Sequence, residues 1–303
     1  MRVIHEWGKY IAIEKDGVER LCYNYQLDGD PNPSAPKPFI HPIRTPNGII
    51  ATAESPLDHI WHRGLWFAWK FVNGVNYWEE NQEIVGRQVT MGVPTVSGGH
   101  IPETVQIASL LQWRDNKDGQ EQIRLSEVRI VTCCLKEDGA ILFDWESRLT
   151  PHGDVLLDRT PFTTWGGYGG LTVRTTQAIQ NQRIIFDDGT TTNRPTGERY
   201  RWGVIEGSLD TGPGTNYAAF VFMPSPASRR FPEPFYGTAK PFFNFFGPAP
   251  LFYEALPLEA HKPLVHNVRV LFLPRPVTAK EVEPYYEEWV HLQTRTGEDE
   301  DPA

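Results

Sequence analysis

The chain has 303 residues, of which 38 are acidic and 29 are basic, and its formal net charge is −9. This balance argues against a surface that binds nucleic acid or an anionic membrane. The sequence contains no uninterrupted apolar run of about 18 residues, the length that would suggest a membrane span. The opening MRVIHEWGKY lacks the basic-then-apolar order of a signal peptide, so we predict a cytoplasmic protein.

Short segments of alternating polar and apolar residues predict β-strands along the chain. In chain order they cover residues 10–14, 122–131, 141–149, 217–222 and 265–273, and most end at turn signals such as Lys-Asp-Gly or Asp-Asp-Gly. One convincing helical pattern comes late. Thr278 and Glu281 have the spacing of a capping box, and they are followed by apolar residues at helical spacing, Val282, Tyr285, Tyr286, Trp289 and Val290. Many strands and one C-terminal helix predict an all-β, antiparallel sandwich.

We predict that residues 1–296 form a single β-sandwich domain. The Pro-rich stretch 30–38 has too few residues before it to separate a second domain, so it predicts a loop. Residues 297–303, GEDEDPA, are acidic and poor in apolar side chains, which predicts a disordered tail. Cys22, Cys133 and Cys134 show no CxxC spacing, which predicts reduced, partly buried thiols.

The densest group of ionisable and aromatic residues lies between positions 39 and 80. Its members are His41, Arg44, Asp58, His59, His62 and Arg63, beside Trp61, Trp66, Trp69 and Trp78. Polar residues interleaved with large rings are typical of a sugar site, where rings stack on the apolar faces of a pyranose. We therefore predict that His41, Arg44, Asp58, Arg63, Trp66 and Trp78 bind a carbohydrate substrate. A single histidine or tryptophan is more often structural, so this prediction depends on the density of the group.

The pair His59-x-x-His62, preceded by Asp58, is the most specific part of this group. Two histidines at this spacing can face one ligand, as catalytic acid and base or as metal ligands. HExxH and CxxC frames are absent and H-x-x-H alone is a weak metal signal. We predict acid–base histidines with no cofactor, and keep a divalent metal bound by His59 and His62 as the alternative.

Carboxylates further along the chain are candidate partners for these imidazoles. Glu127 and Arg129 are two apart on a predicted strand and share a face, as do Asp144 and Glu146. We predict that Glu127 joins the histidines on one concave face as a catalytic carboxylate. The alternative is a solvated sheet face with cross-strand ion pairs of little energetic value.

Two later loops could add to a site. The run TTWGGYGGLTVR at positions 163–174 lacks the pattern of a phosphate loop, so its glycines predict a tight turn or close approach to a ligand, with Trp165 and Tyr168 as stacking surfaces. Arg229 and Arg230 lie in a Pro-rich connection, where they could meet a substrate oxyanion or simply face solvent. The serine elbow GxSxG and the dinucleotide motif GxGxxG are both absent.

Several segments, taken in order, resemble a widespread bacterial family that has been labelled methane-oxygenase-like. They are PFIHPIRTPNG, DHIWHRGLWFAW, NGVNYW, SEVR, FDWES, GGYGGLTVR and MPSPASRRFPEPF. The family commonly shows D-H-P-H-H-R-G, where this chain has Ile60 and Trp61 between its two histidines, and this departure weakens a three-histidine metal site. The oxygenase label conflicts with the lack of a membrane-spanning run. The resemblance implies a β-supersandwich like that of galactose mutarotase, and association with sugar oxidoreductases.

Two classes of function follow. The first is an enzyme that uses His59, His62 and Glu127 for acid–base chemistry on a sugar or keto-sugar glycoside, by β-elimination, epimerisation or hydrolysis. Arg44 and Arg63 would then stabilise the developing enolate oxygen. The second is a carbohydrate-binding or sensing sandwich without catalysis. A histidine buried beside a carboxylate favours the enzyme, whereas an open, flat aromatic platform favours the binding module.

Overall fold

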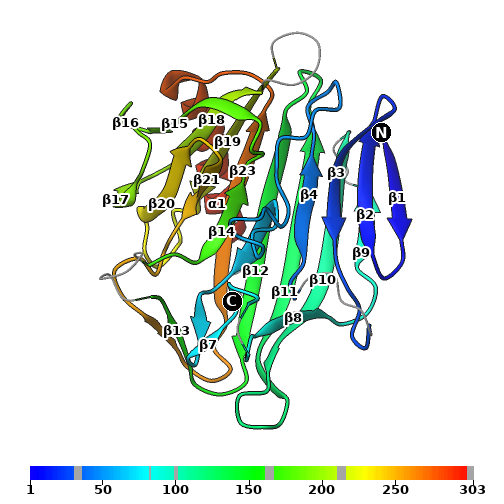
Figure 1. The fold of residues 1–303 in the computed structure, drawn as a ribbon, viewed down its shortest axis with the longest axis vertical. Coiled ribbons are helices and arrows are strands. Elements are labelled where there is room, and N and C mark those ends of the chain that lie inside the picture. The colour runs from blue at the N-terminus through cyan, green and yellow to red at the C-terminus, as the bar shows by residue number, and fades with distance from the viewer. Residues whose placement is uncertain (31–35, 82, 99–101, 161–166, 210–215, 299–303) are drawn as a thin grey trace.

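The computed structural model describes residues 1–30, 36–81, 83–98, 102–160, 167–209 and 216–298, with the backbone alone for residues 294–298. Its strands form two large sheets and one small sheet, and within the described residues every strand pair is antiparallel (Figure 1). The nine-stranded sheet contains, in spatial order, β1 (Arg2–Glu6), β2 (Tyr10–Lys15), β3 (Val18–Asn24), β4 (Phe39–Ile43), β5 (Leu65–Ala68), β14 (Gly170–Arg174), β21 (Phe243–Pro248), β20 (Glu233–Lys240) and β17 (Thr196–Tyr200).

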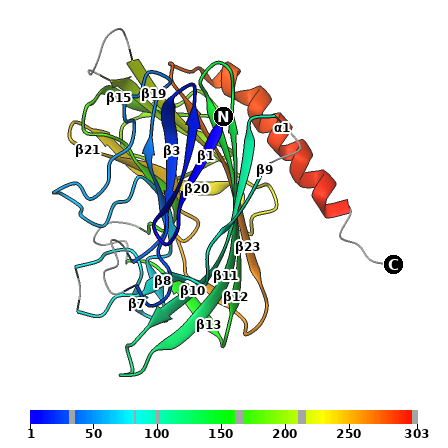
Figure 2. The same cartoon turned by 90° about the vertical axis from the view of Figure 1, so that its right-hand side faces the viewer.

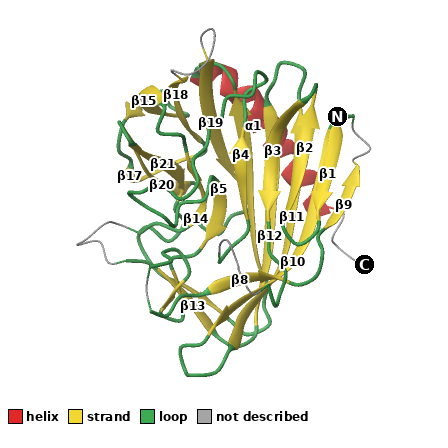
Figure 3. Cartoon of the chain, turned by 45° about the vertical axis from the view of Figure 1, so that its right-hand side comes forward, coloured by secondary structure: helices red, strands yellow, loops and turns green. Residues whose placement is uncertain are grey.

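The ten-stranded sheet lies opposite the nine-stranded one (Figure 3). Its strands are β16 (Thr191–Thr192), β15 (Ile179–Phe186), β18 (Gly203–Leu209), β19 (Asn216–Pro224), β23 (Leu264–Leu273), β12 (Ile141–Pro151), β11 (Gln122–Leu135), β10 (Thr104–Asp115) and β8 (Arg87–Thr90), with β9 (Thr95–Gly98) also paired to β10. The small sheet contains β22 (Leu256–Leu258), β13 (Val155–Asp158), β6 (Phe71–Val72) and β7 (Val75–Asn76). The predicted all-β sandwich is confirmed.

The predicted C-terminal helix is confirmed as α1 (Ala279–Glu298). Thr278 begins it as expected, because its backbone N–H and its hydroxyl donate to the Glu281 carboxylate at 2.9 and 2.8 Å. The buried side of α1 packs on the outer face of the ten-stranded sheet (Figure 2). The helix continues through Glu298, so the tail predicted from Gly297 begins too early; residues 299–303 lie outside the described residues.

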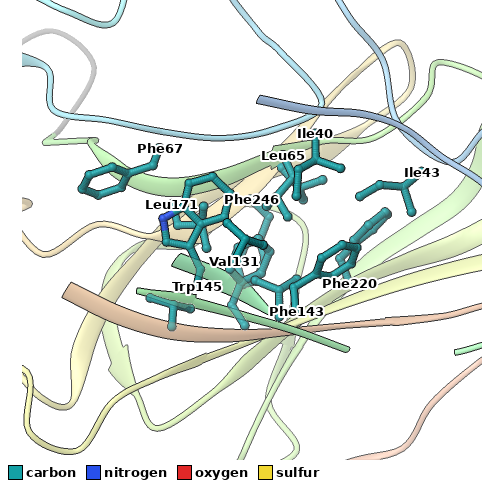
Figure 4. Packing of buried hydrophobic residues seen from close by; sticks show 14 of the residues in the cluster. Ile40, Ile43, Leu65, Phe67, Val131, Phe143, Trp145, Leu171, Phe220 and Phe246 are labelled. Carbon is teal, nitrogen blue, oxygen red and sulfur yellow. The ribbon is translucent and has the colours of Figure 1, made fainter. Parts of the chain in front are cut away.

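The main core lies between the two large sheets. In Figure 4, Ile40, Leu65, Leu171 and Phe246 of the nine-stranded sheet meet Val131, Phe143, Trp145 and Phe220 of the ten-stranded sheet. Strand β5 shows how the nine-stranded sheet divides its side chains, since neighbours on a strand point to opposite faces. Phe67 belongs to this core, whereas Trp66 packs with Phe39, Ala68 and Trp78 on the outer face. That outer face carries the candidate site.

Cys22, Cys133 and Cys134 are all free thiols, and the first two are buried, as predicted. In the described part of the chain, no helix combines the length and the apolar character that a membrane crossing requires.

Candidate functional site

The loop between β4 and β5 folds over the outer face of the nine-stranded sheet and carries both histidines. Two successive turns shape it, with the His59 N–H bonded to the Pro56 carbonyl and the His62 N–H bonded to the His59 carbonyl, each at 2.9 Å. The loop returns to the sheet at Gly64, whose φ is +64°. A side chain there would meet the Ile40 carbonyl oxygen at 2.3 Å, so only glycine allows this close approach.

His62 is buried, with 3% of its surface exposed. Its imidazole packs against Trp66 and Phe245, with ring centroids 5.0 and 5.4 Å away, and meets Trp78 edge-on at 6.4 Å. Its Nδ1 lies 3.3 Å from Nη1 of Arg174. The loop therefore delivers one imidazole into an aromatic surrounding with a guanidinium as its polar neighbour.

Arg174 connects this histidine to Asp58. It ends β14, where Val173 points into the core and Arg174 therefore points to the outer face. Its Nη2 donates to Asp58 Oδ1 at 2.9 Å and to the Phe242 carbonyl at 3.1 Å, and its guanidinium lies 5.2 Å from the centre of the Phe243 ring. We call Asp58, His59, His62 and Arg174 the histidine cluster.

His59 completes the cluster and is its more accessible imidazole. Its Nδ1 lies 2.9 Å from Asp58 Oδ2. Its ring stacks on that of His62, with centroids 4.8 Å apart and an angle of 27° between the planes, and on that of Phe243 at 4.6 Å. His59 and Asp58 each keep about a third of their side-chain surface exposed, at 31% and 32%. A ligand from solvent would meet these two residues first.

Burial and charge set the protonation of the cluster. Burial lowers the pKa of His62 well below its usual value, and the positive charge of Arg174 acts in the same direction. Partial burial opposes ionisation of Asp58, but its hydrogen bond with His59 and the charge of Arg174 prevail and lower its pKa. At neutral pH the cluster therefore contains a neutral His62 and an ionised Asp58.

The two imidazoles are held in opposite tautomers. A guanidinium has only donors, so the His62 Nδ1 that faces Arg174 is the acceptor and the ring proton is on Nε2. An ionised carboxylate has only acceptors, so the His59 Nδ1 that faces Asp58 carries a proton. In its neutral form His59 then has a free lone pair on Nε2, and His62 has an N–H at the same ring position.

The predicted catalytic and substrate-binding residues divide into those inside and those outside the cluster. Asp58, His59 and His62 come together, with Trp66 and Trp78 packed behind His62. Both tryptophans are buried, so in this structure they support the histidine and present no face to solvent.

Arg63 points away from the cluster, into a separate charged network. It bonds Glu54 at 3.1 Å and Glu80 at 2.5 Å. The buried Lys37 joins them, with its Nζ 2.9 Å from Glu80 and 2.8 Å from the Trp78 carbonyl. This network holds the segment that carries Trp78 in place, which is a positioning role for Arg63.

His41 and Arg44 do not converge on the histidines. His41 Nδ1 lies 2.9 Å from the Thr52 hydroxyl, and burial, followed by the charge of Arg44, lowers the pKa of His41 to about 4. Arg44 donates to the Gly48 carbonyl and lies 3.7 Å from Glu19. Within the described residues, no hydrogen bond, ion pair or ring contact joins either one to His59 or His62.

The expectation that Glu127 shares a face with the histidines is wrong. Glu127 and Arg129 lie between the two sheets, and the Arg129 guanidinium lies 5.8 Å from the centre of the Phe67 ring, on the opposite side of β5 from Trp66 and His62. The Arg129 Nε donates to Glu127 Oε1 at 2.7 Å. The alternation of the sequence correctly predicts that Glu127 and Arg129 share one face of their strand. That face points into the core. The solvated alternative for this pair is also wrong.

The other carboxylate pair stays apart from the site as well. Asp144 bonds Arg269 at 2.7 Å on the outer face of the ten-stranded sheet, beneath α1.

The two later loops make contacts of their own. Arg230 donates to the carbonyls of Glu254 and Ala255 and ties two loops together. Trp165 lies outside the described residues, whereas the Tyr168 hydroxyl donates to Glu79 at 2.7 Å and accepts from Lys70 at 3.0 Å.

The metal alternative finds little support in this arrangement. Among the residues that the structure describes, no group of three or more His, Cys, Asp or Glu side chains is placed to hold a metal ion. His62 directs Nδ1 to Arg174, and the Asp58 carboxylate is taken up by His59 and Arg174. These contacts suit a hydrogen-bonded cluster better than a set of metal ligands.

Sequence reasoning missed Arg174 and Phe243, which are both central to the cluster. Arg174 ends the run GGLTVR, and the signal available was an arginine at an outward position of an otherwise uncharged strand. Phe243 begins β21, and nothing local distinguishes it from the other phenylalanines of FFNFF. Both act through contacts with a loop more than a hundred residues from Arg174 in sequence.

Fold and site together define an all-β sandwich with a histidine and arginine cluster on the outer face of one sheet. The chain belongs to the family of unknown function DUF6807, whose model matches residues 10–287. Among curated proteins, none matches the chain.

Proposed function

We propose that this protein is a carbohydrate-active enzyme that moves a proton at a carbon of a sugar or keto-sugar glycoside. The observation that carries the proposal is the stacked pair His59 and His62, 4.8 Å apart, in which His59 turns Nδ1 to a carboxylate and His62 turns Nδ1 to a guanidinium. One imidazole is arranged to accept a proton and its neighbour to donate a hydrogen bond.

His59 is the proposed base. Its Nδ1–H is held by Asp58, so its Nε2 lone pair is available, and imidazole is well suited to accept a proton near neutral pH. His62 is the proposed electrophile, because a neutral imidazole fixed with its proton on Nε2 can donate to a developing oxyanion. Arg174 is a positioning residue, since it fixes the His62 tautomer and orients Asp58.

A keto-sugar gives these groups a reaction to perform. A carbonyl on the ring acidifies the neighbouring C–H, so His59 can take that proton while the enolate oxygen accepts a hydrogen bond from His62. If the enolate turns over in the site, His59 returns the proton to the other face of the carbon as the carbonyl re-forms, which gives an epimer. Alternatively, the C–O bond at the β carbon breaks and the leaving oxygen takes the proton from His59, which is β-elimination.

Hydrolysis by two carboxylates has less support. That mechanism places two carboxyl groups about 5 to 10 Å apart on either side of the bond that breaks. Asp58 is the single carboxylate of the histidine cluster, and it is bonded to His59 and Arg174. The cluster is therefore better suited to proton transfer at carbon.

The keto-sugar substrate implies a source. A sugar oxidoreductase must oxidise the hydroxyl first, and the family resemblance of the sequence points to such a partner. We place both in the cytoplasm, where the free thiols of this chain stay reduced. The mutarotase-like supersandwich suggested by the sequence is consistent with a sugar substrate, by analogy of fold alone.

The test is to incubate the protein with a panel of glycosides and their 3-keto derivatives, with and without a chelator, and to follow products by mass spectrometry. We expect the wild type to convert a keto-glycoside both with and without the chelator. The variant His59→Gln should lose this conversion. Binding of several sugars without conversion would support the non-catalytic module instead. Loss of activity on chelation would support the metal alternative.

A further inference from the structure

The histidine cluster is bordered by apolar side chains that face solvent. Leu57 is 98% exposed, Phe242 is 69% exposed and Ile60 is 46% exposed. We call these three residues the apolar rim. Single exposed apolar residues are ordinary, but these three flank the accessible side of one polar cluster, where the apolar part of a bound ligand would lie.

One guanidinium nitrogen ties the two halves of the rim together. Arg174 Nη2 donates both to Asp58, the neighbour of Leu57, and to the carbonyl of Phe242. Leu57 lies in the turn closed by the His59 N–H and the Pro56 carbonyl, and Ile60 lies in the next turn. The rim is therefore held on hydrogen-bonded turns beside Asp58 and His59.

Phe242 occupies a backbone position that does not favour phenylalanine. With Pro241 it connects β20 to β21, where Lys240 pairs with Phe243, and its φ is +64°. A proline followed by a residue with positive φ is the order of a type II turn, whose third position favours glycine or asparagine. A bulky residue there is strained and is retained when the surroundings or a function require it. The ring does not fill the core, because it is mostly exposed.

Exposure increases from one side of the cluster to the other. His62 is almost fully buried, His59 is partly exposed and Leu57 is almost free in solvent. A substrate whose reacting carbon lies against His59 would therefore direct its leaving group toward the rim. Three side chains offer a few hundred Å² at most, less than the roughly 800 Å² per partner of a standard protein interface.

We propose that the apolar rim is a subsite for an aromatic or otherwise apolar aglycone, so that the substrates are glycosides of apolar alcohols or phenols. This inference rests on the proposed function for its sugar half. It adds the chemical class of the group that leaves.

The experiment compares 4-nitrophenyl and methyl glycosides of the same sugars, each as its 3-keto derivative, with affinities from calorimetry and turnover from mass spectrometry. We expect the wild type to bind the 4-nitrophenyl compound about tenfold more tightly, in line with the energy of aromatic contacts. Leu57→Ser and Phe242→Gly should each reduce this ratio severalfold. The control Leu110→Ser, which removes a 58% exposed leucine on the ten-stranded sheet, should leave it unchanged.

Phe242→Gly adds a second readout. If the phenylalanine is retained for ligand binding at the expense of backbone strain, this variant should melt at a higher temperature than the wild type while it loses the preference for the aryl glycoside. A lower melting temperature would assign Phe242 a structural role and overturn its part in the proposal.

The possible outcomes test the aglycone subsite and the proposed enzymatic function independently. An aryl preference that depends on the rim, without conversion of any glycoside, supports the subsite and contradicts the enzyme. Conversion with equal affinity for both compounds supports the enzyme and overturns the subsite. A concentration-dependent dimer that Leu57→Ser dissociates would also overturn it, by assigning the rim to a contact between protein chains. If neither compound binds, both proposals fail.

Discussion

The imidazoles of His59 and His62 stack 4.8 Å apart, yet His59 turns its Nδ1 to a carboxylate and His62 turns its Nδ1 to a guanidinium. The side chain opposite each ring decides which nitrogen holds the proton. Two identical residues thereby acquire different chemistry, as base and as hydrogen-bond donor, without any difference in their covalent structure.

This relationship predicts the nuclear magnetic resonance spectrum of the two rings. We expect the ¹⁵N shifts of His62 to report a neutral ring protonated on Nε2 as pH is lowered from 8 through 6.5, because burial and Arg174 lower its pKa well below its usual value. Arg174→Met should release this tautomer and raise the pKa of His62 through loss of the positive charge. A His62 that becomes protonated near pH 6.5 in the wild type would contradict the assignment.

Kinetics on a converted substrate should separate the two roles. His59→Gln and His62→Ala should each lower kcat by roughly 10²–10⁴, the usual contribution of positioned proton transfer and hydrogen bonding. Asp58→Asn should retain substrate binding but lower kcat, because the amide can present its N–H to His59 and favour the wrong tautomer. Near-normal turnover in His59→Gln would remove His59 as the base.

The sequence predicts the sandwich well because its signals are local. Alternation marked strands such as β11 and β12, and the Thr278 capping box marked the start of α1. The histidine pair was also found, because both members lie in one loop. The role of Arg174 depends on which strands become neighbours, and no local pattern encodes that pairing.

The error over Glu127 has a related cause. Period-two spacing shows which residues share a face, but not whether that face points to solvent or into the core. Glu127 and Arg129 share their face with Leu125 and Val131, whose apolar character was the available sign of an inward face.

Stability should fall in mild acid because buried histidines resist protonation. Burial lowers the pKa of His266 to about 4, whereas the unfolded chain titrates near 6.5. Between these values the unfolded state binds more protons, so the free energy of unfolding decreases as pH falls, by about 1.4 kcal/mol per pH unit for each such group. His41, whose pKa is also lowered to about 4, acts in the same direction.

His266→Phe tests this account, because the ring that stacks on Phe67 at 5.1 Å is kept while the titrating group is removed. Between pH 7 and 4.5, urea unfolding should show a loss of stability about 2 to 3 kcal/mol smaller than in the wild type. Equal slopes in the variant and the wild type would contradict the assignment of the acid sensitivity to His266.

The pair Glu127 and Arg129 should contribute to stability and not to catalysis. Within the sandwich the Glu127 carboxylate accepts hydrogen bonds from Arg129, Trp113 Nε1 at 2.7 Å and Ser147 Oγ at 2.6 Å. Glu127→Ala leaves the Arg129 charge buried without its counter-ion, so we expect a loss of about 3 to 5 kcal/mol in the free energy of unfolding. The double variant Glu127→Leu with Arg129→Met removes both charges and should recover much of that loss. Per folded molecule, turnover of a converted substrate should be unchanged in both variants. A large fall in kcat in the well-folded double variant would restore Glu127 to the active site, against its position between the sheets.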